Sequence, residues 1–114
     1  MASTTIKSKY TLLWTNSNAW ATFNSQTLSL DLSKYKFIIV QFRRIANQDQ
    51  YVDSLCAVDG TETLCFSVPS DANNQYISCR MINVSASAIS FRDSYTNGAT
   101  NNDRMIPHRI YGIN

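Results

Sequence analysis

The chain has a single histidine, His108, which stands beside Pro107 in an apolar run near the C-terminus. Catalysis by an imidazole needs a nucleophile and an orienting carboxylate within hydrogen-bond range. A small hydrolase would require such a serine or carboxylate beside His108, and no spacing in the sequence marks one. We therefore expect His108 to be structural or exposed. We expect no catalytic residues, and we expect that the protein is not an enzyme.

Metal ligands and cofactor motifs are equally sparse. A zinc site needs several histidine or cysteine ligands at short spacings, and the sequence has none. Asp93 and Asp103 bracket a polar segment that contains Asn97, Asn101 and Asn102, so these residues could supply oxygens to Ca²⁺. The segment lacks the regular alternation of ligands that a calcium loop has. We therefore favour the interpretation that these side chains stabilise the loop through hydrogen bonds. We expect no metal and no cofactor.

The three cysteines, Cys56, Cys65 and Cys79, are an odd number and form no Cys-x-x-Cys motif. We interpret them as small buried hydrophobic residues. Cys56 and Cys65 flank the Asp59-Gly60 turn, and one hairpin register would place them opposite each other. A disulfide there would need an oxidising compartment.

Two aromatic residues in polar surroundings are the candidates for recognition. Trp20 follows Asn16-Ser17-Asn18-Ala19, so its ring could stack on a ligand while amides hydrogen-bond outward, or it could fold back and cap the end of the domain. Tyr95 begins an Asn-rich segment of the composition that recognition loops favour, although an ordinary turn is the alternative. The predicted ligand-binding residues are Trp20, Tyr95, Asn97, Asn101 and Arg104.

Composition indicates which elements must position these side chains. The 114 residues are 44% hydrophobic and only 16% charged, against about 25% charged in typical domains. Short hydroxyl and amide side chains replace the missing charge, and they compete with the backbone bonds of helices. We predict a single all-β domain over residues 1–114, with residues 1–8 allowed to be flexible.

Charge and hydropathy exclude two classes of partner. The net charge is +2, and only Arg43 and Arg44 are adjacent among the basic residues. Nucleic-acid binding needs clustered cations, so we expect no nucleic-acid partner. The first residues lack the apolar stretch of a signal peptide, and no window approaches the length of a membrane span. We expect no membrane insertion.

Strand-like segments recur about every ten residues, which predicts an antiparallel β-sandwich, jelly-roll-like, of about seven or eight strands. Leucines alternate with polar residues in the second segment, and Phe37–Arg43 is apolar on both faces, as in a central strand. The expected strands are Tyr10–Thr15, Thr27–Leu32, Phe37–Arg43, Tyr51–Val58, Glu62–Val68, Tyr76–Val84, Ala88–Arg92 and Met105–Ile113.

The turns between these strands carry three further expectations. Asp59-Gly60 tolerates positive φ, so we expect Tyr51–Val58 and Glu62–Val68 to form a hairpin. We expect loops at Pro69–Asn74 and, as the longest polar loop, at Tyr95–Asp103. The last strand stays apolar to its end, which indicates that it completes a sheet, and Pro107 favours an edge or a bulge in it.

The order of segments resembles small β-modules of tailed phages and prophages, which occur alone or at the ends of fibre and other virion proteins. The resemblance covers nearly the whole chain and rests on the Leu12-Leu13-Trp14-Thr15-Asn16 start, the segment from Gln26 to Tyr35, Phe37-Ile38-Ile39-Val40, and the ending Ile106-Pro107-His108-Arg109-Ile110-Tyr111-Gly112-Ile113. His108 departs from that pattern, which often has an aromatic tyrosine at this place. These segments are mostly core strands, so they report fold more than function.

The resemblance implies a virion-associated structural or adhesion module, made in the host bacterial cytoplasm, that binds a host-surface glycan or another particle protein through its loops. It also implies a homo-oligomer, with a trimer as our expectation and the last strand near the interface. The alternative is a cytoplasmic phage protein that inhibits a bacterial defence system by binding a protein or a signalling nucleotide. For that role Arg43, Arg80, Arg92 and Arg104 would have to converge on phosphates.

Overall fold

The computed structural model describes residues 9–68 and 76–114, and within them the chain forms nine strands and no helix. The expectations for residues 1–8 and for the loop at 69–74 lie outside the described residues. None of the described segments is a helix that could cross a membrane. The strands are β1 (Tyr10–Thr15), β2 (Gln26–Ser29), β3 (Phe37–Ile45), β4 (Tyr51–Ala57), β5 (Glu62–Ser67), β6 (Ser78–Val84), β7 (Ala88–Thr96), β8 (Ala99–Thr100) and β9 (Arg104–Ile113).

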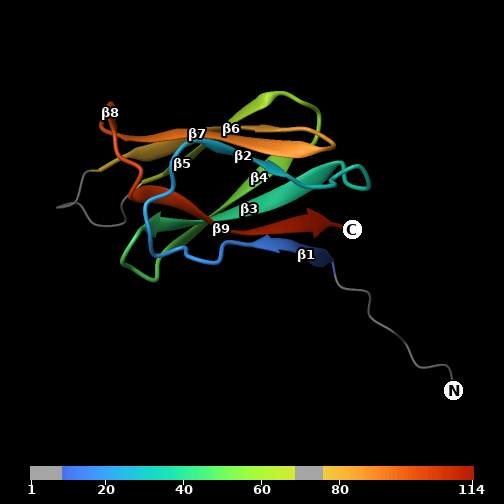
Figure 1. Cartoon of the computed structure of the whole chain (residues 1–114), viewed down its shortest axis with the longest axis horizontal. Coiled ribbons are helices and arrows are strands. Elements are labelled where there is room, and N and C mark those ends of the chain that lie inside the picture. Colours follow the sequence, from blue (N-terminus) through green and yellow to red (C-terminus); the bar gives the residue numbers. More distant parts are fainter. Residues whose placement is uncertain (1–8, 69–75) are drawn as a thin grey trace, which may run out of the picture.

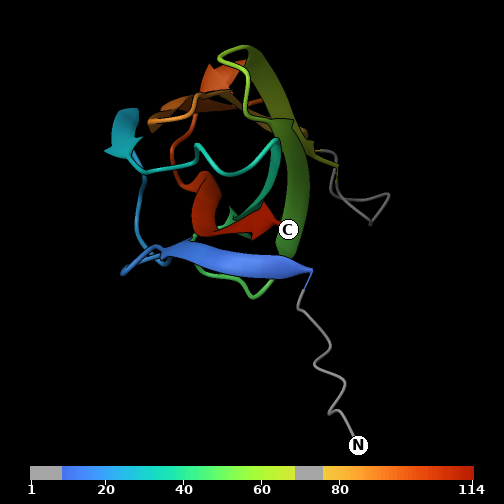
Figure 2. The same ribbon diagram turned by 90° about the vertical axis from the view of Figure 1, so that its right-hand side faces the viewer.

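The strands form two antiparallel sheets that pack face to face (Figure 1). The four-stranded sheet has the order β1-β9-β3-β4. The five-stranded sheet has the order β2-β7-β6-β5, with β8 paired to β7. Seen at right angles, the two layers enclose one interior, with β4 and β5 along the same side (Figure 2). The predicted all-β sandwich is confirmed.

The last strand lies inside its sheet, as its apolar composition predicts. β9 pairs with β1 on one side and with β3 on the other, and Ile113 stands opposite Tyr10. The register between β3 and β9 shifts where Pro107 faces Phe42, so the proline occupies a bulge and not an edge. β3 is central, because it also pairs along its length with β4.

The expected hairpin of β4 and β5 is wrong. β4 pairs with β3 and β5 pairs with β6, so the turn between them crosses from one sheet to the other. Gly60 does take the positive φ that the Asp-Gly pair suggests, with φ +80°. The glycine accommodates a tight turn, but it does not determine which strands pair beyond it.

Several strand boundaries differ from the expected ones, and the differences are largest around β7, which runs to Thr96, and at β2. The segment Tyr95–Asp103 is not one long loop, because Asn97 and Gly98 both have positive φ and form a tight turn between β7 and β8. β2 is shorter than Thr27–Leu32 and ends at Ser29. Beyond it the amides of Leu30 and Leu32 still bond the carbonyls of Ser87 and Ala86, so the leucines continue to face inward.

Apolar residues at alternate strand positions fill the space between the sheets. From β3 they are Ile38, Val40 and Phe42, all completely buried. The five-stranded sheet contributes Ile82, Val84, Ile89 and Phe91, and β9 contributes Met105, Ile106 and Ile110. Each side chain of this size stabilises the fold by about 1.5–3 kcal/mol on burial.

The largest completely buried side chain is a cation, Arg80 of β6. Its guanidinium donates to four backbone carbonyls, those of Phe23 at 3.0 Å, Arg92 at 2.7 Å, Arg104 at 3.3 Å and Met105 at 2.9 Å. It also lies 5.4 Å from the centre of the Phe23 ring. Burial lowers the pKa of Arg80 to about 10, so the side chain stays protonated at neutral pH.

Replacing Arg80 with methionine keeps most of its length but removes every donor. We expect Arg80→Met to lower the free energy of unfolding by about 3–5 kcal/mol, because four buried carbonyls lose their partner. Arg92→Met is the control: Arg92 pairs with Glu62 on the exposed surface, where such pairs contribute at most about 1 kcal/mol. Urea unfolding at constant m-value measures both, and equal small losses would contradict a central role for Arg80.

Candidate functional site

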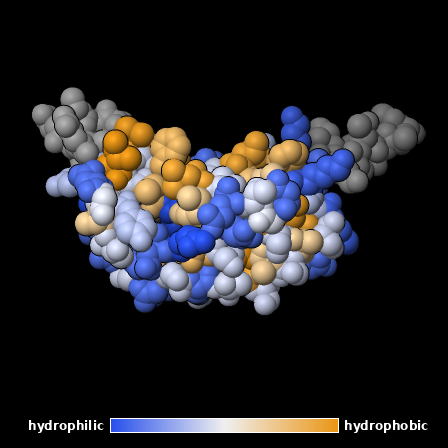
Figure 3. Space-filling model, turned by 90° about the horizontal axis from the view of Figure 1, so that it is seen from above, coloured by the Kyte–Doolittle hydropathy of each residue, from blue (hydrophilic) through white to orange (hydrophobic). Residues whose placement is uncertain are grey.

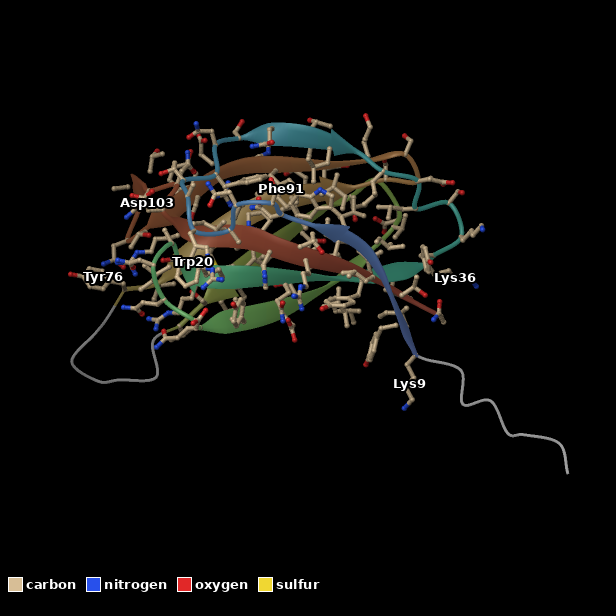
Figure 4. All side chains as sticks on the ribbon, turned by 60° about the horizontal axis from the view of Figure 1, so that its bottom comes forward. Lys9, Trp20, Lys36, Tyr76, Phe91 and Asp103 are labelled. Carbon is tan, nitrogen blue, oxygen red and sulfur yellow. The ribbon has the colours of Figure 1, made fainter. Side chains whose placement is uncertain are left out.

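Three connections meet at one end of the sandwich and surround a hollow of about 650 Å³. They are the loop between β1 and β2, the turn between β3 and β4, and the segment between β8 and β9. In Figure 4, Trp20 and Asp103 lie at this end, and Lys9 and Lys36 lie at the opposite end. The lining includes Trp20, Thr22, Asn47, Gln48, Asn101 and Arg104.

Local bonds hold the loop that carries Trp20 against β9. Asn16 donates from its side chain to the carbonyl of Pro107 at 2.8 Å and accepts the amide of Asn18 at 2.9 Å. The two residues that flank the tryptophan region, Ala19 and Phe23, are buried in the core. Because Ala19 and Phe23 are buried on either side of Trp20, the indole lies over Arg43 near the end of β3.

The indole of Trp20 stacks on the guanidinium of Arg43, which lies 3.8 Å from the ring centre. Arg43 is only 3% exposed, whereas Trp20 is 53% exposed. The tryptophan therefore covers a buried cation and still offers about half of its surface to solvent. Both interpretations of Trp20 from the sequence, a capping residue and an exposed one, describe part of this arrangement.

Arg43 is held in place from below by β4 and the turn before it. Its guanidinium donates to the carbonyl of Gln48 at 2.8 Å, to the carboxylate of Asp49 at 2.9 Å and to the hydroxyl of Tyr51 at 2.9 Å. The hydrogen bond from Arg43 lowers the pKa of Asp49, so the ion pair persists well below neutral pH. Three hydrogen bonds therefore hold the guanidinium beneath Trp20.

The stack of planar groups continues along the outer side of the four-stranded sheet. The rings of Tyr51 and His108 lie 4.9 Å apart at an angle of 25°. His108 makes a hydrogen bond of 3.0 Å between Nδ1 and the side-chain oxygen of Gln41. Burial lowers the pKa of His108, and the charges of Arg109 and Arg43 lower it further.

The structure brings together three of the five predicted ligand-binding residues. Trp20, Asn101 and Arg104 line the same hollow, although more than eighty residues separate the first from the last. Arg104 also leaves its buried Nη1 without a hydrogen-bond partner in the described part of the chain.

The other two predicted residues lie elsewhere. Tyr95 is exposed on the outer face of the five-stranded sheet, where it borders a separate hollow of about 480 Å³ with Leu64 and Met81. Figure 3 views the molecule from that side and shows hydrophobic side chains exposed there. Asn97 belongs to the turn before β8, and its side-chain oxygen accepts the amide of Ile77 at 3.1 Å.

Sequence reasoning considered Arg43 only for phosphate binding and missed Tyr51, and these two residues complete the site. The Arg43-Arg44 pair suggests surface charge, and only the register that sets Arg43 opposite Tyr51 shows that one of the two arginines is enclosed. The alternation of β3 predicts which side Arg43 faces. It does not predict that a loop residue closes over it.

The remaining chemical candidates have structural partners. His108 makes a hydrogen bond with Gln41 and stacks on the ring of Tyr51. Asp93 accepts the side-chain amide of Asn102 at 2.9 Å, and Asp103 accepts the hydroxyl of Thr22. Among residues 9–68 and 76–114, no group of three histidine, cysteine or acidic side chains is placed to hold a metal ion.

Comparisons with known proteins add no family assignment. No protein-family model matches this sequence, and no curated protein is significantly similar to it.

The position of His108 predicts a specific pH dependence of stability. Its pKa is lower in the folded protein than the ordinary value of about 6.5, so the unfolded chain takes up the proton first as pH falls. Stability contributed by the neutral imidazole is therefore present above that value and is lost as pH falls from 7 to 5. Urea unfolding at both pH values should show a larger loss for the wild type than for His108→Gln. Equal losses would mean that His108 is not the titrating group.

Proposed function

We propose that the protein is a phage virion-associated adhesion module that binds a host-surface glycan at the loop-end hollow beside Trp20. The observation that carries this proposal is the half-exposed indole, fixed on a buried arginine at the rim of a polar hollow. The resemblance to small phage β-modules supports the setting. A homotrimer in the virion stays a prediction, which light scattering and mass spectrometry of purified particles would measure.

A sugar suits this combination of groups. The C–H face of a pyranose stacks on an aromatic ring, and its hydroxyls need donors and acceptors at the ring's margin. Asn47, Gln48 and Asn101 supply amides there, and Arg104 adds a positive charge to the lining. Because Arg43 fixes the indole beforehand, binding orders few additional groups.

The nucleotide-binding alternative loses its main support. Arg80 is enclosed in the core with its guanidinium bonded to carbonyls, and Arg92 pairs with Glu62 on the five-stranded sheet. Arg43 is covered by Trp20. Of the four arginines considered for phosphate binding, only Arg104 lines the hollow, and one cation is a weak basis for holding a nucleotide.

The proposal predicts that Trp20→Ala lowers glycan affinity about tenfold or more, because the stacking surface is lost. Trp20→Phe should retain part of the binding. Tyr95→Ala is the matched control, since it removes an exposed aromatic ring from a different hollow and should leave affinity unchanged. An array of bacterial surface polysaccharides identifies the glycan, and titration calorimetry measures the affinities.

Thermal unfolding of each variant must accompany these measurements, because Trp20 also covers Arg43. If the wild type binds no polysaccharide on the array, the glycan proposal fails, and capture of another particle protein becomes the function to test. If Tyr95→Ala abolishes binding and folded Trp20→Ala does not, the site lies on the five-stranded sheet instead.

A further inference from the structure

Two buried thiols from different sheets meet inside the sandwich. Cys56 of β4 and Cys65 of β5 are each 1% exposed and lie close enough to perturb each other, and the Cys56 thiol donates to the carbonyl of Ser54 at 3.7 Å. All three cysteines of the chain are free in this structure. We propose that Cys56 and Cys65 form an oxidation site, at which a hydroperoxide converts the two thiols into a disulfide that joins the two sheets.

The placement follows from the strands and not from a hairpin. Cys56 stands opposite Ile38 of β3, and Cys65 stands opposite Arg80 of β6, so both side chains point into the interior from separate sheets. β4 leads into the Asp59-Gly60 turn and β5 follows it, and both strands lie along the same side of the sandwich (Figure 2). The thiols therefore meet across the gap that separates the two edge strands.

The surroundings make one thiol the nucleophile and the other its partner. The interaction with Cys56 lowers the pKa of Cys65, whereas the interaction with Cys65 and burial raise the pKa of Cys56. Thiolate character and exposure together control cysteine oxidation. Because the two thiols are equally buried, the one with the lower pKa, Cys65, reacts first and Cys56 follows.

The chemistry balances without a cofactor. The sulfur of Cys65 attacks the terminal oxygen of the hydroperoxide, the O–O bond breaks, and an alcohol (or water, from hydrogen peroxide) leaves with a proton. The sulfur of Cys56 then attacks the resulting sulfenic acid, the S–S bond forms, the S–O bond breaks, and water leaves. The two thiols are oxidised by two electrons, and the peroxide is reduced by two.

The disulfide would join the two sheets covalently at the side where β4 and β5 are the edge strands. It closes the short segment between residues 56 and 65, which restricts the unfolded chain and joins the edge strands of both sheets. We expect the disulfide to raise Tm by roughly 10 °C. This inference does not depend on glycan binding.

Hydrogen peroxide is the probe. After treatment of the reduced wild type, maleimide labelling in denaturant should fall from three thiols to one, and the mass should drop by two hydrogens. Peptide mapping should show the Cys56–Cys65 link, and Tm should rise and then return after reduction with dithiothreitol. An unchanged mass, a link through Cys79 or a lower Tm would overturn the proposal.

Matched variants locate the effect. Cys79→Ser should keep the full peroxide response, because Cys79 faces the outer side of the five-stranded sheet, opposite the exposed Phe66. Cys56→Ser and Cys65→Ser should each lose the Tm increase. If a serine variant fails to fold, the peptide map of the wild type still decides whether the link forms.

Discussion

The guanidinium of Arg80 is the constraint on which the rest of this structure depends. A charge inside a protein is tolerated only when its donors are satisfied, and here backbone carbonyls take that role in place of a bonded carboxylate. The carbonyls come from the loop before β2, from β7 and from the start of β9, so one side chain holds three distant segments together. It also bonds the carbonyl of Met105, whose φ of +47° is unfavourable for a side chain by about 1–2 kcal/mol. The strained turn into β9 and the buried charge therefore stabilise each other.

This core contact also positions the candidate site. Phe23, which bonds Arg80, lies three residues after Trp20, and Arg104, which also bonds it, lines the hollow. Both ends of the site are thus attached to the same cation. A second arginine, Arg43, repeats the arrangement at the surface, where it is enclosed by Trp20 and bonded to Asp49. Two cations that would ordinarily be solvated instead set the shape of one end of the sandwich.

Most of the strand positions along the chain could be predicted from the sequence, because they depend on local patterns. The apolar run of β3, the alternating leucines after Thr27 and the proline bulge in β9 follow from side-chain period and from the missing N–H of proline. The sequence could not show that β4 and β5 belong to different sheets, because an Asp-Gly turn suits a hairpin and a turn between sheets equally. The Asn97-Gly98 pair is a hairpin signal of the same kind, and the polar residues around it obscured it. Partner choice is a property of the whole sheet, and a single turn does not encode it.

The site was predictable only in part for the same reason. Trp20, Asn101 and Arg104 could be selected from the sequence because they stand in polar segments near turns. That they line one hollow depends on the pairing of Thr15 with Arg109, which brings the loop after β1 to the start of β9. Burial of Arg43 depends further on the β3–β4 register. Once these pairings form, the indole cannot turn away without exposing a guanidinium that is held in place by Gln48 and Asp49. Such a ring has little freedom left to lose, so a ligand that stacks on it gains the contact at a small cost in conformational entropy.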